Sequence, residues 1–216
     1  MTRIQAKPQV LIVDDDAAIR AMLALTLEYH GYVVSEADNL AQAQACLAQQ
    51  TFAVIVLDLG LPPDEHLATQ GLAFLGWLSR EGYGAKVLVL TGQDHQDNAY
   101  ACVKAGAFDF LLKPISEAKL LSAVERATLF FQQTQRMKAE EGFQPLYVNA
   151  QLGEGMKAVR NQAEEKFIRQ VLFDTDFNVH ETARRLGLKR ENVYYLIKKY
   201  HIQRVLDPAE DEGSTP

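Results

Sequence analysis

The chain has 216 residues, of which 48% are hydrophobic and 23% charged, and its formal net charge at pH 7 is −6. This is ordinary globular composition, which excludes fibrous and broadly disordered chains, and the length suits one large or two small domains. Because the N-terminus lacks a signal-peptide core and no run reaches the roughly 18 apolar residues of a membrane span, we expect a cytoplasmic protein without a membrane partner.

Residues 9–131 alternate five times between a short apolar run and a helical pattern. This alternation is typical of βα units, which build a parallel sheet with helices on both faces. The expected fold class is therefore α/β, a doubly wound five-stranded parallel sheet. We expect strands at 9–13, 32–36, 52–57, 85–90 and 107–112, and helices at 17–30, 39–50, 71–81, 95–105 and 116–138.

Two of these helices carry apolar stripes with clear boundaries. Gly31 is a stop signal for the first helix, and Asp16 is either its N-cap or a metal ligand. The stripe of the last helix packs on the sheet or, alternatively, docks on a second subunit. The stripes are Ile19, Met22, Leu23 and Leu27 in the first helix, and Leu120, Leu121, Val124, Thr128 and Phe131 in the last.

The rest of the chain differs in composition. Residues 1–153 carry 11 basic and 17 acidic side chains, residues 154–206 carry 11 basic and 7 acidic ones, and the last ten carry four acids. An acidic front and a basic back predict two units with different partners. The expected domains are 1–131, a helix extension and linker at 132–153, a helical domain at 154–206, and an acidic disordered tail at 207–216.

Polar side chains follow four of the apolar runs. Since the carboxyl ends of parallel strands meet at one edge, these side chains are expected to share one crevice. Carboxylates hold a hard cation, a lysine can pair with a phosphoryl oxygen, and a hydroxyl adds a hydrogen-bond donor. The residues are Asp14 and Asp15, Asp58, Thr91 and Lys113.

The segments LIVDDD, VLDLGLP, VLTG and FDFLLKP, in this order and spacing, resemble the receiver domain of two-component response regulators over residues 8–131. The resemblance implies a flavodoxin-like sheet of order 2-1-3-4-5. It implies phosphorylation of Asp58 by a sensor histidine kinase, and Thr91 and Phe110 as a switch pair. It implies that Mg²⁺ (or Mn²⁺) is held by Asp15, Asp58 and the Gly60 carbonyl, with Asp14 acting through water.

One departure is the loop between Asp58 and Gly71, which is longer than usual in receivers. This insertion either alters kinase choice and dephosphorylation or is a neutral surface loop. His66 and His95 lie near the expected site without metal-ligand spacing, so we interpret them as solvated loop residues. The cysteines, at positions 46 and 102, show neither pairing nor metal-ligand spacing and are expected to be unpaired in a reducing compartment.

Residues 154–206 read as three helices. Asn178 is a plausible N-cap, and Gly187 ends the second helix. A short helix, a turn and a second helix starting near Arg190 match helix-turn-helix organisation, in which the second helix enters the major groove. Apolar faces are expected from Phe167, Ile168, Val171 and Leu172, from Val179, Ala183 and Leu186, and from Val193, Ile197 and Tyr200.

The pattern A-R-R-L-G-L-x-R-x-x-x-Y resembles the Fis-type DNA-binding domain over residues 162–203. The resemblance implies dimerisation through the first helix, about 156–173. Tyr194, Tyr195 and Leu196 stand where such helices often carry basic residues, which leaves Leu196 to face solvent, DNA or a partner. The expected DNA contacts are Lys189, Arg190, Asn192, Tyr194, Tyr195, Lys198 and Lys199.

The sequence thus predicts a response regulator that is a phosphoacceptor rather than an enzyme and regulates transcription. Phosphorylation is expected to favour a homodimer that binds a two-fold symmetric site on double-stranded DNA. No G-x-x-x-x-G-K-[ST] segment occurs, so the ATPase of larger regulators is missing from this chain. The alternatives are a signalling adaptor whose helices bind protein and, less favoured, a phosphoaspartyl phosphatase.

Overall fold

A computed structural model describes residues 8–62, 68–92, 99–142, 146, 148 and 155–203. The chain divides into two compact units, an α/β unit built on five strands and a helical unit built on three helices. Within the described ranges, no helix combines the length and the apolar character needed to cross a membrane. The predictions for His66, for His95 and for the acidic tail concern positions outside the described residues, as does most of the linker.

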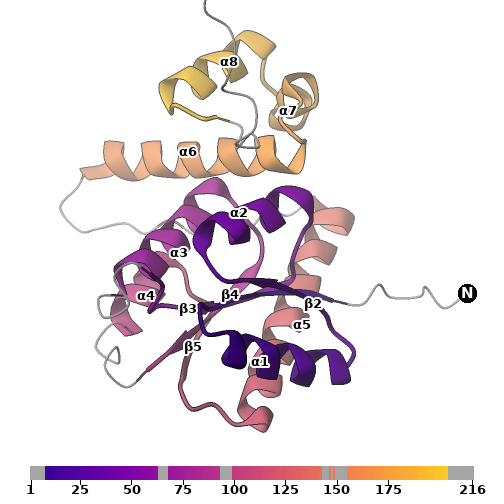
Figure 1. Cartoon of the computed structure of the whole chain (residues 1–216). Helices are drawn as coiled ribbons and strands as arrows, with labels where there is room; N and C mark the ends of the chain where they lie inside the picture. Colours follow the sequence, from indigo (N-terminus) through magenta and orange to yellow (C-terminus); the bar gives the residue numbers. More distant parts are fainter. Residues whose placement is uncertain are drawn as a thin grey trace, which may run out of the picture. The chain divides into compact units, whose positions relative to one another are not determined.

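The α/β unit is one parallel sheet of order β2-β1-β3-β4-β5, which confirms the flavodoxin-like fold. Helices α1 and α5 cover one face of the sheet, and α2, α3 and α4 cover the other (Figure 1). The strands are β1 (Gln9–Val13), β2 (Val33–Ala37), β3 (Val54–Asp58), β4 (Lys86–Thr91) and β5 (Asp109–Leu112). The helices are α1 (Ala17–Tyr29), α2 (Leu40–Gln49), α3 (Thr69–Glu81), α4 (Ala99–Ala105) and α5 (Glu117–Glu141).

The central strands are apolar because helices cover both of their faces. All five residues of β3 are buried, as are Val10–Val13 of β1. The strand order reverses between β1 and β3, and in open α/β sheets the crevice at such a switch point lies outside the carboxyl ends of the strands. Every polar residue that the sequence placed in one crevice follows or ends one of these strands.

The helices of the α/β unit agree with their predicted stripes in most positions. Leu23 and Leu27 of α1 and Leu120 and Val124 of α5 share one core cluster with the sheet, so α5 packs on the sheet as expected. Met22, in contrast, is 49% exposed, which makes the buried stripe of α1 narrower than predicted. The α5 helix ends three residues later than predicted, and both cysteines are free, Cys102 buried and Cys46 half-buried.

The helical unit contains α6 (Gly155–Asp174), α7 (Val179–Leu186) and α8 (Arg190–Lys199). Asn178 caps α7 by accepting a hydrogen bond from the Glu181 amide, and Gly187 ends α7 in the left-handed region at φ 64°. The core holds Ile168, Leu172, Ala183, Val193, Leu196 and Ile202. These three helices form the small all-α unit that the sequence predicted.

Two residues of the helical unit differ in burial from what the sequence predicted. Leu196 is only 8% exposed and packs in the core, so the expectation that it faces solvent, DNA or a partner is wrong. The reason is helical geometry, because position 196 follows the buried Val193 by three residues and shares its face. Phe167 is 40% exposed and thus lies at the edge of the buried face of α6, not within it.

Candidate functional site

The loop after β1 is held by side chains that bind its backbone. Arg20 of α1 donates from Nη1 to the carbonyl oxygens of Asp14, at 2.7 Å, and Asp15, at 2.9 Å. Asp16 caps α1 by accepting hydrogen bonds from Ala18 N and Ile19 N. Its carboxylate is therefore engaged at the helix N-terminus, which favours the cap over a metal role.

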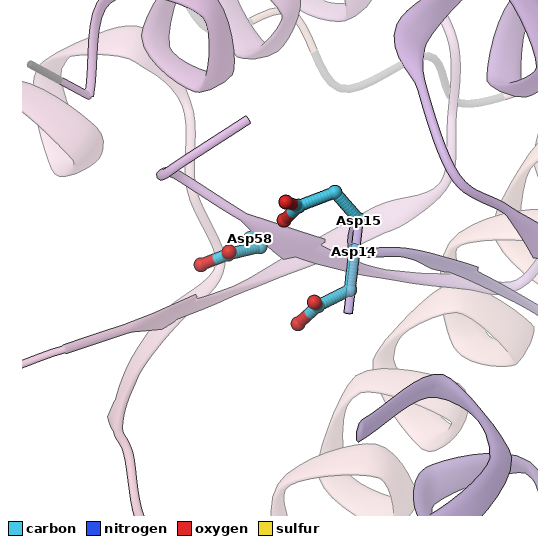
Figure 2. A group of neighbouring side chains, drawn as sticks. All are labelled: Asp14, Asp15 and Asp58. Carbon is cyan, nitrogen blue, oxygen red and sulfur yellow. The ribbon is translucent and has the colours of Figure 1, made fainter. Parts of the chain in front are cut away.

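Three carboxylates meet at the carboxyl edge of β1 and β3. One oxygen each from Asp14, Asp15 and Asp58 can be chosen so that all lie within 4.8 Å of one another (Figure 2). Asp14 and Asp58 are buried, at 1% and 7% exposure. Because buried carboxylates repel one another and are costly to desolvate, this arrangement favours a bound cation.

Lys113 supplies one positive charge to this cluster. Its ammonium lies 2.7 Å from an Asp14 carboxylate oxygen and 3.1 Å from an Asp58 oxygen. Burial alone would lower the pKa of Lys113, but its hydrogen bond to Asp14 and the nearby charges raise that pKa overall. Burial, joined by the charge of Asp58, raises the pKa of Asp14 despite the hydrogen bond from Lys113.

Thr91 and Phe110 lie on the same face of the sheet. Thr91 pairs with Leu112, and Phe110 precedes Leu112 by two residues, so alternation places both side chains on that face. Thr91 is fully buried at the end of β4, and its hydroxyl donates to the Gly92 carbonyl at 3.3 Å. Phe110 is half-buried. Thr91 thus ends β4, and Phe110 lies within β5 on the same face of the sheet.

The backbone after Asp58 is packed against the start of α3. Gly60 stands between the buried residues Leu59 and Leu61. A Cβ added to Gly71 would lie 2.7 Å from the Leu59 Cα and 3.0 Å from the Asp58 carbonyl oxygen. Such a contact is too short for any side chain, so glycine at position 71 lets α3 approach the segment that carries Asp58.

The helical unit presents most of the predicted DNA contacts on an exposed face of α8. Exposed side chains there are Lys189, Arg190, Asn192, Tyr194, Tyr195 and Lys198. Lys199 has a different setting, since its ammonium lies 2.7 Å from the Glu164 carboxylate of α6, which also accepts from the Tyr200 hydroxyl. The hydrogen bond to Glu164 raises the pKa of Lys199. Because it connects the two helices, Lys199 joins α8 to α6 in this structure.

The carboxyl end of α8 is fixed by a buried arginine. Arg169 of α6 is 8% exposed and donates from Nη2 to the Tyr200 carbonyl at 3.0 Å and from Nε to Glu165 at 3.1 Å. A cation at the carboxyl end of a helix also suits the helix dipole. Arg169 therefore sets the position of α8 on α6.

Sequence reasoning missed Arg20, Gly71 and Arg169. All three act through backbone atoms or close approach, for which a sequence carries no direct signal.

The two units of the chain match two different known families. Residues 10–125 match the response regulator receiver domain, and residues 160–200 match the Fis family of bacterial regulatory proteins. The chain belongs to the response regulator family. Its receiver carries the acidic cluster and Lys113, and its Fis-family segment carries α7 and α8.

Curated relatives of this response regulator differ in length. RegA, the photosynthetic apparatus regulatory protein of Rhodovulum sulfidophilum, is 31% identical over 192 residues, covering 89% of this chain and 92% of RegA. PmrA, a transcriptional regulatory protein of Pectobacterium parmentieri, is 34% identical over 116 residues, covering 54% of this chain and 50% of PmrA. PilR, a response regulator of Pseudomonas aeruginosa, is 31% identical, covering 73% of this chain and 33% of PilR. The chain thus spans half or less of PmrA and PilR but nearly all of RegA.

Solved receiver structures share the fold of the α/β unit. A CheY-like receiver from Methanospirillum hungatei has a TM-score of 0.54 and 26% identity, covering 59% of this chain and 98% of that one. The beryllofluoride-activated NtrC4 receiver domain dimer has a TM-score of 0.52 and 32% identity, covering 57% of this chain and 98% of that one.

Proposed function

We propose that this protein is the response regulator of a two-component system and acts as a transcription factor. A sensor histidine kinase phosphorylates Asp58, and phosphorylation controls dimerisation and DNA binding. The observation that carries the proposal is the crevice in which Lys113 contacts Asp14 at 2.7 Å and Asp58 at 3.1 Å, with Asp15 beside them. Both proposed partners, the kinase domain and the chromosome, place the protein in the cytoplasm.

The acidic cluster fits a hard divalent cation. Its carboxylate oxygens are the ligands that Mg²⁺ or Mn²⁺ prefers, and they lie within reach of a single ion. Asp15, Asp58 and the Gly60 carbonyl would hold the ion, with Asp14 assisting through water. When bound, the ion neutralises charge on the phosphoryl oxygens during transfer.

The residues of the crevice have different roles in phosphoryl transfer. A carboxylate oxygen of Asp58 attacks phosphorus, so a new P–O bond forms as the P–N bond to the kinase histidine breaks. Lys113, already in contact with Asp58, pairs with a phosphoryl oxygen of the product. The chain accepts the group and is not itself a catalyst of turnover.

The switch in this proposal is a shift between two receiver conformations. Thr91 moves its hydroxyl from the Gly92 carbonyl toward the phosphoryl group, and the Phe110 ring turns inward on the same sheet face. The changed surface around α4, β5 and α5 then favours a homodimer. The dimer presents two α8 helices to the half-sites of a two-fold symmetric duplex.

Phosphorylation of the full chain by a small phosphodonor such as acetyl phosphate with Mg²⁺, followed by mass spectrometry, tests the site. The wild type should gain one phosphoryl group on Asp58, and Asp58→Asn should gain none. Asp16→Asn is the matched control, because asparagine keeps the α1 cap and this carboxylate is engaged by backbone amides. Equal labelling of Asp58→Asn would refute the site.

Binding to duplex DNA at several salt concentrations tests the second half of the proposal. Contacts to phosphates release counterions, so affinity should fall steeply as salt rises. The double variant Lys189→Ala/Arg190→Ala should bind much more weakly. If the chain binds no duplex in either phosphorylation state, the helical unit is a protein-binding adaptor.

A further inference from the structure

The exposed face of α8 carries an acid at its centre. Glu191, Tyr195 and Lys198 are spaced by four and three residues and form one line along the helix. All three are exposed, and they lie opposite Val193 and Leu196, which are buried in the core. Glu191 is in the first turn of α8, the end by which a recognition helix meets base edges.

Glu191 differs from the neighbouring acids of the helical unit in its surroundings. Glu181 binds Arg184 at 2.7 Å and Arg185 at 2.9 Å, and Glu164 binds Lys199 at 2.7 Å. Within residues 155–203, by contrast, no ion pair or side-chain hydrogen bond engages Glu191. Its carboxylate is therefore available to a ligand that approaches the exposed face.

Two effects of this carboxylate oppose each other in a DNA-binding helix. A negative charge in the first turn stabilises the helix through its dipole, which accounts for an acid at this position but not for its place at the centre of the exposed face. The same charge repels DNA phosphates and so weakens binding to every sequence. A base that donates a hydrogen bond to the carboxylate offsets this repulsion, and only at sites that contain that base.

We propose that Glu191 selects cytosine in each half-site of the DNA, an inference that rests on the proposed DNA-binding function. In the major groove cytosine presents its N4 amino group as a donor, and a carboxylate is an acceptor only. Thymine and guanine place acceptors at the corresponding position and are repelled, and adenine places its N7 acceptor beside its N6 donor, so a carboxylate pairs less well with adenine than with cytosine. Glu191 is thus a specificity residue that lowers affinity for non-specific DNA. Lys198, in contrast, raises affinity for DNA of any sequence.

Selection from a random duplex library tests this inference. The full chain is used with beryllofluoride and Mg²⁺, as the wild type and as the variants Glu191→Gln, Glu191→Ala and Lys198→Ala. The wild type should enrich cytosine roughly tenfold at one symmetric pair of positions. Glu191→Gln should change that preference to adenine, because an amide can pair with adenine N6 and N7.

The remaining variants distinguish base recognition by Glu191 from general DNA affinity and from an effect on the helix dipole. Glu191→Ala should lose the preference at that position alone and bind unrelated duplex more tightly than the wild type. Lys198→Ala should bind all sequences more weakly with unchanged preferences. Thermal denaturation of each variant measures the contribution of the helix dipole independently.

Three results would overturn the inference. If both Glu191 variants select the wild-type sequence at every position, Glu191 does not read a base, although the DNA-binding function stands. If they lower the melting temperature while leaving base preference unchanged, the acid acts only on the helix dipole. If the wild type binds no duplex, the proposed function itself fails, and the inference fails with it.

Discussion

Arg20 holds the backbone of the acidic loop rather than its carboxylates. Its guanidinium donates to the carbonyl oxygens of Asp14 and Asp15 and lies 3.5 Å from the Glu36 carboxylate. Groups that orient metal ligands contribute strongly to metal affinity even though they do not touch the ion. Arg20 therefore prepares the loop for the cation that the proposed function requires.

We predict that Arg20→Ala weakens Mg²⁺ binding roughly tenfold, measured by calorimetric titration of the full chain. Glu36→Ala is the matched control, because it removes the ion pair but leaves both carbonyl contacts in place, and it should bind Mg²⁺ nearly as the wild type does. Unchanged affinity in Arg20→Ala, with normal thermal unfolding, would mean that the loop is held without this contact.

Contacts of this kind between single residues could not be predicted from the sequence. Asp14, Asp15, Asp58 and Lys113 could be placed in one crevice because strand ends carry a positional signal. Arg20 binds carbonyl oxygens, which every residue possesses, so nothing marked it as a loop anchor. Likewise, the pairing of Lys199 with Glu164 joins residues 35 positions apart, and α8 alone gave no sign of it.

At the scale of elements, α3 offers two glycines in contrasting surroundings. A Cβ on Gly71 would lie 2.7 Å from the Leu59 Cα, whereas a Cβ on Gly76 would meet no atom within 4 Å. The first glycine is required by packing against the segment that follows Asp58. The second is not, and its lack of a side chain only weakens the helix.

We predict opposite signs for the two alanine substitutions. Gly71→Ala should lower the free energy of unfolding by about 1–3 kcal/mol, since backbone atoms must move to admit the methyl group. Gly76→Ala should raise it by up to about 1 kcal/mol through helix propensity. Urea unfolding measures both free energies. Equal effects would show that Gly71 of α3 does not lie as close to Leu59 as in this structure.

The α7 helix carries a small pH-dependent stabilisation. Hydrogen bonds from Arg184 and Arg185 lower the pKa of Glu181 from 4.5 to about 2. Because the folded-state pKa is depressed, the stabilisation is present above pH 4.5 and is lost as the pH falls toward 2. The pair is exposed, so salt screens it.

We predict that Glu181→Gln lowers the melting temperature modestly at neutral pH in dilute buffer. The difference from the wild type should disappear as the pH approaches 2 and should shrink when salt is added, because both remove the charge interaction. If the difference in melting temperature persists unchanged at low pH, it arises from hydrogen bonding or packing of the uncharged side chain and not from its charge.

Element type and order could be predicted because apolar runs, Gly31, Asn178 and Gly187 marked where elements begin and end. The failures arose where one helix face had to be chosen. In α8 the stripe of Val193, Ile197 and Tyr200 left Leu196 outside, although a spacing of three also shares a face. In α1 the stripe reached Met22, but burial is confined to a narrower line of residues.

In the molecule as a whole, the proposed switch requires phosphorylation of the receiver to change what the helical unit binds. A phosphoryl group can shift an equilibrium only by the difference in its interaction with the two receiver states. In the proposed mechanism, dimerisation would convert that shift into DNA affinity, because two α8 helices would bind one symmetric site together. Loss of Asp58 should therefore abolish regulation while leaving basal DNA binding intact.

The most direct test is the affinity of the full chain for its selected duplex, measured by fluorescence anisotropy with and without beryllofluoride and Mg²⁺. We predict that the mimic raises wild-type affinity about tenfold, within the usual range of coupling between sites, and leaves the affinity of Asp58→Asn unchanged. Equal wild-type affinity in both states would contradict control of DNA binding by phosphorylation.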